Sequence, residues 1–185
     1  KGLILQLAVQ GKLTKTWRVL RQAQEPTLDP ASVLLEKIKA EKVQLIRDKK
    51  IKKEKPLPEI TEKEIPYELP EGWEWCRLGS YIHNFGQKTP DKEFEYIDVA
   101  SVNNRLGVIS DNLEVFSAIE APSRARKIVK EGCVIYSTVR PYLLNIAIVD
   151  RKFNLEAIAS TAFAILNPLA GCPEKYLYQV LRSIF

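Results

Sequence analysis

Apolar residues recur at helical spacing in two segments of the first 50 residues. Residues 3–9 are mostly apolar and are followed by Gly11, so we expect the last turns of a helix that began earlier and ends in a left-handed glycine cap. Residues 31–50 follow Asp29 and Pro30, which favour the cap and first position of a second helix. Its lysines are expected to be solvated, and one face carries Leu34, Leu35, Ile38, Leu45 and Ile46.

From residue 67 onward the pattern changes to short apolar runs separated by turn residues. Residues 52–66 contain three prolines and alternating charges, which predicts a linker. Trp73 and Trp75 are expected to pack in the core from one face of the first strand. A closing helix is expected from residue 173. The predicted strands cover residues 73–78, 96–102, 108–109, 113–116, 133–137, 146–149 and 161–166.

These elements predict an α+β fold class, in which a mixed, small β-sheet domain with flanking helices follows a helical and linker segment. The expected division is residues 1–66 for the helices and linker, and residues 67–185 for the β-sheet domain. The chain starts at Lys1 and has no methionine, which predicts a fragment of a longer protein that is truncated at both ends.

Composition narrows the class of protein. The 185 residues are 45% hydrophobic and 28% charged, and no apolar run approaches the roughly 20 residues of a membrane span. No signal-peptide pattern is present either, so we expect a cytoplasmic protein with no membrane partner. The three cysteines are far apart and odd in number, which argues against a disulfide framework and a zinc site.

Charge is unevenly distributed along the chain. Residues 1–55 carry fourteen basic and six acidic groups, whereas residues 56–185 carry fourteen basic and seventeen acidic groups. Binding to nucleic acid would therefore depend on one basic face of the β-sheet domain and not on overall charge.

The densest basic segment is residues 121–145, where a basic turn leads into an apolar strand and then into hydroxyl groups, an arginine and a tyrosine. Four cations are suited to DNA phosphates: Arg124, Arg126, Lys127 and Lys130. Three residues near the strand end are candidates for base contacts: Thr138, Arg140 and Tyr142. Second-tier candidates in two other turns are Gln87, Lys88, Asn103, Asn104 and Arg105. A solvated loop beside a core strand explains the same pattern.

Patterns that would indicate catalysis are weak. The eight glycines form no dinucleotide-binding or phosphate-binding loop, and the single histidine, His83, has no cysteine at metal-ligand spacing. The segment from Asn167 lacks the second proline and the aromatic residue of an amino-methyltransferase motif, and the acids near Asp91 lack the lysine of a nuclease motif. We therefore predict no catalytic residues and no metal site.

Several segments together resemble the specificity subunit of type I restriction-modification enzymes. They are LILQLAVQGKL, ASVLLEKIKAEKVQLIRDKKIKKEKPLP, IPYELPEGWEWCRLG, APSRARKIVKEGCVIYSTVRPYLLN and STAFAILNP with KYLYQVLRS. The resemblance implies the end of the central conserved helical region followed by one target-recognition domain. It implies sequence-specific binding to one half of a bipartite DNA site, which a fragment alone would bind weakly or not measurably.

The resemblance also implies partners. Methyltransferase subunits would use S-adenosylmethionine, and a restriction subunit would use ATP and Mg²⁺, so no cofactor is expected in this chain. An alternative is that the chain mainly docks a methyltransferase subunit through Leu34, Ile38 and Leu45. A nuclease activity of the chain itself is a third possibility that no residue pattern favours. The DNA sequence recognised cannot be read from these residues, because readout depends on loop geometry and DNA shape.

Overall fold

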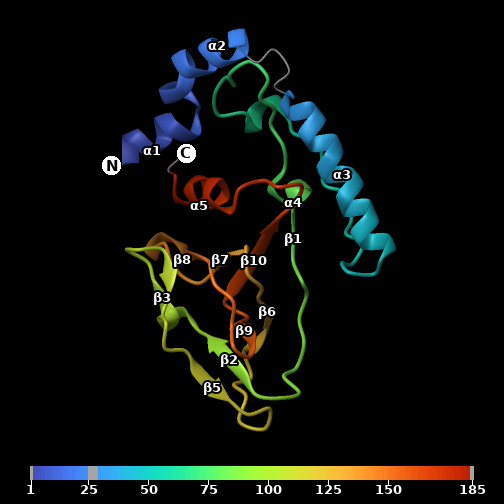
Figure 1. Cartoon of the computed structure of the whole chain (residues 1–185), viewed down its shortest axis with the longest axis vertical. Helices are drawn as coiled ribbons and strands as arrows, with labels where there is room; N and C mark the ends of the chain where they lie inside the picture. The colour runs from blue at the N-terminus through green and yellow to red at the C-terminus, as the bar shows by residue number, and fades with distance from the viewer. Residues whose placement is uncertain (1, 25–28, 184–185) are drawn as a thin grey trace. The chain divides into compact units, whose positions relative to one another are not determined.

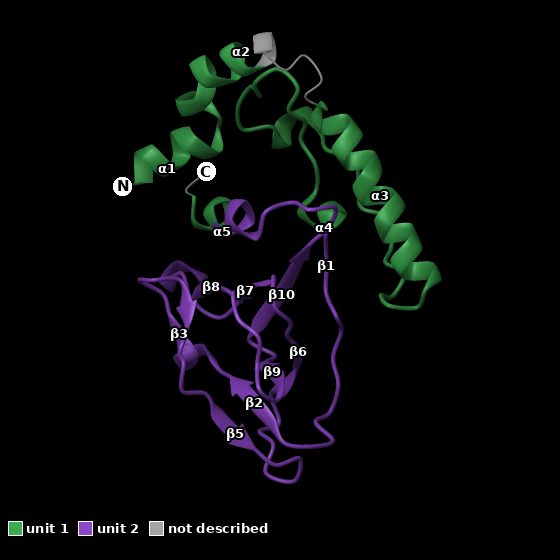
Figure 2. Cartoon of the chain, viewed as in Figure 1, with its two compact units in different colours: residues 1–81, 179–185 green, residues 82–178 purple. Residues whose placement is uncertain are grey.

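A computed structural model describes residues 2–24 and 29–183. The chain divides into two compact units (Figure 2). Unit 1 comprises the residues up to 81 together with those from 179 onward, and unit 2 comprises residues 82–178. Helix α5 (Glu174–Arg182) begins in unit 2 and ends in unit 1. The predicted functional division at residue 66 stays a prediction.

Unit 1 is built from helices and extended segments. The helices are α1 (Gly2–Val9), α2 (Lys15–Gln24), α3 (Ala31–Arg47) and α4 (Leu78–Tyr81), with short 3-10 helices η1 (Lys12–Thr14) and η2 (Glu62–Glu64). Gly11 has φ 71°, so the predicted left-handed glycine after α1 is confirmed. It is closely surrounded, because a methyl group at this position would lie 2.9 Å from Pro70 Cγ.

The start of α3 differs from the prediction in its cap. Pro30 is extended and occupies the N-cap position, while the Asp29 carboxylate accepts a bond from Lys37 Nζ at 2.7 Å instead of capping the helix. The first helical amide, of Ala31, donates to the Gly72 carbonyl at 2.8 Å. The Gly72 carbonyl, and not the predicted Asp29 side chain, therefore accepts the hydrogen bond of this first amide of α3.

The linker is irregular apart from η2, and one arginine holds it. Arg77 donates to both carboxylate oxygens of Glu64 at 2.6 and 3.0 Å, and to the carbonyls of Pro58 and Glu59 at 3.0 and 2.7 Å. This fork-like pairing lowers the pKa of Glu64 from its ordinary 4.5 to about 2, with bonds from Thr61 adding to the effect.

The predicted strand at residues 73–78 is wrong. Residues 73–77 form no strand, and α4 begins at Leu78. The tryptophans make separate aromatic contacts: Arg18 lies 5.5 Å from the Trp73 ring centroid, and Tyr67 meets Trp75 edge-on at 4.9 Å. These contacts, with the side-chain bonds of Arg77, hold the segment without strand pairing.

Unit 2 contains two four-stranded sheets and a short hairpin (Figure 1). The first sheet has the order β1 (Ile82–His83), β10 (Phe163–Pro168), β7 (Val134–Ser137) and β8 (Ile146–Ile148). The second has the order β5 (Glu114–Phe116), β2 (Phe94–Ile97), β9 (Glu156–Ser160) and β6 (Ala125–Ile128). β3 (Val102–Asn103) and β4 (Val108–Ile109) form the hairpin.

Pairing is antiparallel except between β2 and β9, so the first sheet is antiparallel and the second is mixed, and the predicted α+β class is confirmed. Three strands, β1, β6 and β9, were not predicted. The main core contains buried side chains from both sheets, among them Ile97, Ile135 and Phe163. A smaller cluster of Phe94, Tyr96 and Ile158 is closed by Phe116.

Candidate nucleic-acid interface

The turn between β9 and β10 brings two parts of the predicted basic segment together. At this turn the Thr161 amide donates to the Arg124 carbonyl at 2.8 Å, and the Thr138 amide donates to the Ala162 carbonyl at 2.8 Å. The start of β6 and the end of β7 therefore lie on either side of one tight turn. The Arg124 and Thr138 side chains are both solvent-exposed.

The loop of residues 138–145, which follows β7, is firmly anchored. Thr138 Oγ1 adds a second bond to the Ala162 carbonyl at 2.9 Å, and the Ser137 amide donates to the Asn145 carbonyl at 3.0 Å. Inside the loop, Arg140 and Leu144 have φ values of 50° and 51° and flank the 3-10 helix η4 (Pro141–Leu143). Left-handed backbone is uncommon for residues other than glycine and is concentrated at functional sites.

The turn that joins β3 to β4 lies against this loop. Asn104 Nδ2 donates to the Leu143 carbonyl at 2.8 Å, and the hairpin packs beside β8 (Figure 1). The Asn103 side chain is used within the turn, because its Oδ1 accepts from the Arg105 and Leu106 amides at 3.2 and 3.1 Å. Of this turn, Arg105 presents an exposed charged side chain at the surface.

Six predicted residues thus gather at one end of unit 2, which we call the arginine surface. They are Asn104, Arg105, Arg124, Thr138, Arg140 and Tyr142. Residues 103–108 and 138–145, which form most of it, contain no aspartate or glutamate. The surface therefore offers three guanidinium groups and the Tyr142 hydroxyl, while the Asn104 amide and the Thr138 hydroxyl bind backbone carbonyls. This is a set of donors suited to phosphates and base edges.

The remaining predicted cations lie along β6. A β-bulge between Ala125 and Lys127 leaves Arg126 as the extra residue, and both Arg126 and Lys127 are half-buried. Gln87 pairs with Lys127 across the free edge of β6, and the Lys88 amide donates to the Arg126 carbonyl at 2.9 Å. The sequence missed β6 as a strand because its basic residues indicated a turn.

Two of these lysines are engaged within the protein. Lys88 Nζ lies 2.8 Å from carboxylate oxygens of both Asp91 and Glu156, and the bonds to Asp91 and then Glu156 raise its pKa. Lys130 Nζ lies 4.4 Å from the centroid of the Phe85 ring. DNA would have to displace these contacts of Lys88 and Lys130. The arginine surface is therefore better suited to binding a polyanion than the basic residues along β6.

Apolar side chains on the arginine surface were not singled out from the sequence. Leu106 is 68% exposed, and Val139 and Leu143 are exposed near the predicted Tyr142, which is itself 75% exposed. In a sequence, a single apolar residue within a turn is weak evidence for a binding surface. The structure strengthens that evidence here, because it places residues 103–108 in contact with residues 138–145.

The three predicted partner-binding residues differ in exposure. Ile38 is only 2% exposed and is the buried residue of α3, whereas Leu45 is half-buried. Leu34 is 37% exposed and Val43, on the same helix, is 51% exposed. A partner could reach Leu34 directly but not Ile38, and the partner-binding role of all three stays a prediction.

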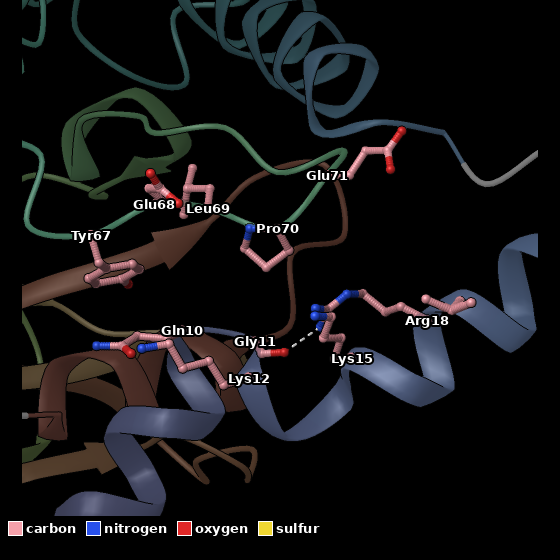
Figure 3. Close-up of a pocket in the computed structure, with 11 residues that line it drawn as sticks. Gln10, Gly11, Lys12, Lys15, Arg18, Tyr67, Glu68, Leu69, Pro70 and Glu71 are labelled. Carbon is pink, nitrogen blue, oxygen red and sulfur yellow. Dashed lines mark hydrogen bonds between the residues drawn. The ribbon is translucent and has the colours of Figure 1, made fainter.

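Unit 1 has an open pocket of about 490 Å³ between η1, α2 and residues 67–71 (Figure 3). Lys12, Lys15 and Arg18 line it together with Glu68 and Glu71. The Arg18 guanidinium is turned toward the Gly11 carbonyl, to which it donates at 2.6 Å (Figure 3). Charges of both signs line this pocket, so it is less suited to a polyanion than the arginine surface.

Across residues 2–24 and 29–183, no group of three or more histidine, cysteine, aspartate and glutamate side chains could hold a metal ion. His83 is buried and its Nε2 contacts the Asn167 side-chain amide. No helix in the described part of the chain has the length and apolar character needed to cross a membrane.

No family model matches the chain. It is 58% identical over 85 residues to the specificity subunit of the type I restriction enzyme EcoAI from Escherichia coli, and 52% identical over 84 residues to that of EcoEI from the same organism. These matches cover 46% and 45% of this chain, and 13% of each relative. The chain therefore matches only a small part of the length of these relatives.

Two solved structures are also similar. The HsdS subunit from Thermoanaerobacter tengcongensis aligns with a TM-score of 0.58 and 34% sequence identity, over 64% of this chain and 31% of that chain. A chain from work on complex assembly and conformational transition of the type I R-M system aligns over the same shares with a TM-score of 0.59 and 34% identity. The predicted resemblance to type I specificity subunits is confirmed by these similarities.

Proposed function

We propose that this chain, which is similar to part of a type I restriction enzyme specificity subunit, is a DNA target-recognition segment whose unit 2 contacts double-stranded DNA through the arginine surface. Similarity to specificity subunits in both sequence and structure supports the class of function. The observation that carries the proposal is the convergence of Arg105 and Arg140, which lie in two contacting loops that contain no acid, with Arg124 immediately before β6.

In the proposed mechanism, different residues provide affinity for the DNA backbone and recognition of the base sequence. Arg124 lies at the start of β6, where an exposed guanidinium can bind a backbone phosphate and fix orientation without reading sequence. Arg140 lies in the anchored loop after β7, where a guanidinium can pair with two acceptors of a guanine edge. Thr138 has its hydroxyl engaged with the Ala162 carbonyl, so its part is to hold the loop in position.

The finer parts of this proposal concern partners. The chain would be non-catalytic and would direct methyltransferase and restriction subunits to a bipartite DNA site. Those subunits would use S-adenosylmethionine, ATP and Mg²⁺, and the chain itself would hold no cofactor. A cytoplasmic location, as predicted from the sequence, belongs to the same proposal.

Charge reversal tests the DNA surface. We expect Arg124→Glu with Arg140→Glu to weaken binding to random-sequence duplex DNA, measured by fluorescence anisotropy between about 50 and 200 mM salt. Each phosphate contact contributes about 0.9 to the slope of log affinity against log salt, so losing the phosphate contact of Arg124 lowers the slope by about 0.9. The matched control is Lys152→Glu with Lys175→Glu, which changes net charge equally at exposed positions outside this surface. Equal weakening by both double variants would show that net charge alone governs binding.

A second candidate function is docking of a methyltransferase subunit by α3. Leu34 is exposed and Leu45, eleven positions later on the same face of this helix, is half-buried, which favours this face as an interaction surface. We expect Leu34→Asp to reduce co-purification with a methyltransferase subunit and to leave the DNA affinity of unit 2 unchanged. Loss of DNA binding with retained assembly would refute this division of roles.

A further inference from the structure

The loop of residues 138–145 combines rigidity with an exposed aromatic ring. Its first residue, Thr138, is held by two bonds to one carbonyl, and Asn104 holds Leu143 at the far end. Two residues that are not glycine, Arg140 and Leu144, have left-handed backbone on either side of η4. Such backbone persists only where the surrounding contacts impose it, so this loop is preorganised to present the side chains between them.

The side chains presented by this loop are not those of a purely electrostatic surface. Tyr142 is 75% exposed, and Leu143 and Leu106 are exposed on the two contacting loops. Arg105 and Arg140 come from the same two loops, which contain no acid. Proteins that bend DNA combine these features, because cations bind the phosphates while an apolar or aromatic side chain enters between base pairs.

We propose that the loop of residues 138–145 is a wedge, which inserts the Tyr142 ring at a base-pair step while Arg105 binds a flanking phosphate. This inference rests on the proposed function and adds how the DNA is read. A step that is easily unstacked would be preferred, so part of the sequence preference would come from DNA deformability and not from hydrogen bonds to bases. Rigidity is essential to this role, because a flexible loop would fold back instead of separating two stacked base pairs.

The test compares two duplexes that differ in the energy needed to unstack them. Both are about 24 base pairs long, and one carries a two-nucleotide bulge at its centre. Fluorescence anisotropy of the whole chain at about 50 mM salt gives the affinity for each. We expect the bulged duplex to bind about tenfold more tightly, because part of the unstacking has already occurred.

Variants assign the preference to the ring. Tyr142→Ala is expected to bring the two affinities within about twofold of each other, and Tyr142→Phe to keep the preference, because the stacking face remains. The control is Ile119→Ala, which removes a 98% exposed apolar side chain from a different loop of unit 2 and is expected to change neither affinity. Since Tyr142 is so exposed, its replacement is expected to leave the circular dichroism spectrum unchanged.

The outcomes separate the wedge from the proposed function. If neither duplex binds, DNA binding by this chain fails and the wedge fails with it. If both duplexes bind equally well, or if Tyr142→Ala keeps the preference for the bulge, the wedge is overturned and DNA binding stands. If Tyr142→Ala changes neither affinity, the exposed ring serves a contact other than DNA, which also overturns the proposal.

Discussion

Gly107, in the turn between β3 and β4, provides the sharpest test of how the arginine surface is held. It has φ 74°, and a methyl group added at its Cα would lie 1.9 Å from the Tyr178 hydroxyl oxygen and 2.5 Å from the adjoining ring carbon. Its carbonyl also accepts from the Ile148 amide at 3.2 Å. Gly107→Ala therefore forces both an unfavourable backbone conformation and a displacement of the Tyr178 ring.

The magnitude has two parts. Left-handed backbone costs a residue with a Cβ atom about 1–2 kcal/mol. Overpacking adds about 1–3 kcal/mol, because a ring cannot move aside as a flexible side chain can. We expect Gly107→Ala to lower the free energy of unfolding by about 2–5 kcal/mol. Gly132→Ala is the matched control, because Gly132 has φ 86° and nothing within 4 Å of the added methyl, so only the backbone part, about 1–2 kcal/mol, remains.

The assay is urea denaturation followed by far-ultraviolet circular dichroism. Tryptophan fluorescence would not report on unit 2, because Trp17, Trp73 and Trp75 all belong to unit 1. Repeating Gly107→Ala in a Tyr178→Ala background removes the overpacking and is expected to reduce its effect to that of Gly132→Ala. Equal losses from Gly107→Ala and Gly132→Ala, or a loss that Tyr178→Ala does not relieve, would refute the proposed close packing.

Three further predictions concern single residues. Glu64 has a pKa of about 2, below its ordinary 4.5, so its stabilising contribution is present at neutral pH and is lost as pH falls from 4.5 toward 2; NMR titration measures this, and Arg77→Met is expected to return the pKa toward 4.5. Burial raises the pKa of Cys133 to about 11, so iodoacetamide at pH 8 is expected to label it only after unfolding, and rapid labelling in native protein would contradict this. Ile38→Ala is expected to destabilise unit 1 by about 2–5 kcal/mol in urea melts followed by tryptophan fluorescence, and a loss under about 1 kcal/mol would contradict its buried position.

Elements whose conformation depends on local residue types were predicted correctly from the sequence. Gly11 ends α1 in the predicted left-handed conformation, because a glycine after an apolar helix is favoured there. The helix at residues 31–50 exists and ends three residues earlier, at Arg47. The runs at β4, β5, β7 and β8 form strands within one residue of the predicted bounds, since β-branched and aromatic residues between turns favour strands.

Long-range pairing decided the elements that the sequence missed. β9 reads Glu-Ala-Ile-Ala-Ser and shows no alternation, because both of its faces are buried: Ala157 and Ala159 in the main core, and Ile158 in the smaller cluster. β6 carries adjacent basic residues, Arg126 and Lys127, at a bulge where both are half-buried. Trp73 and Trp75 looked like strand residues, yet contacts with Arg18 and Tyr67 hold them outside any sheet.

The candidate site was predictable as a set of residue types but not as a surface. Arg124 and Arg140 are sixteen positions apart in the sequence, and only the bonds through Thr161 and Ala162 bring their segments together. From the sequence, Lys88 and Arg105 were equally ranked as second-tier candidates for DNA contacts. The structure distinguishes them, because Lys88 is paired with Asp91 and Glu156.

The most direct test of DNA recognition by the arginine surface is a titration of ¹⁵N-labelled chain with a short duplex, followed by amide and arginine side-chain NMR shifts at about 50 mM salt. This measurement detects binding even at the dissociation constants of about 10⁻⁴ M that are typical of non-specific complexes. We expect the largest shifts in residues 104–106 and 138–143 and at Arg124. No shift at millimolar DNA, or shifts confined to residues outside this surface, would contradict the account.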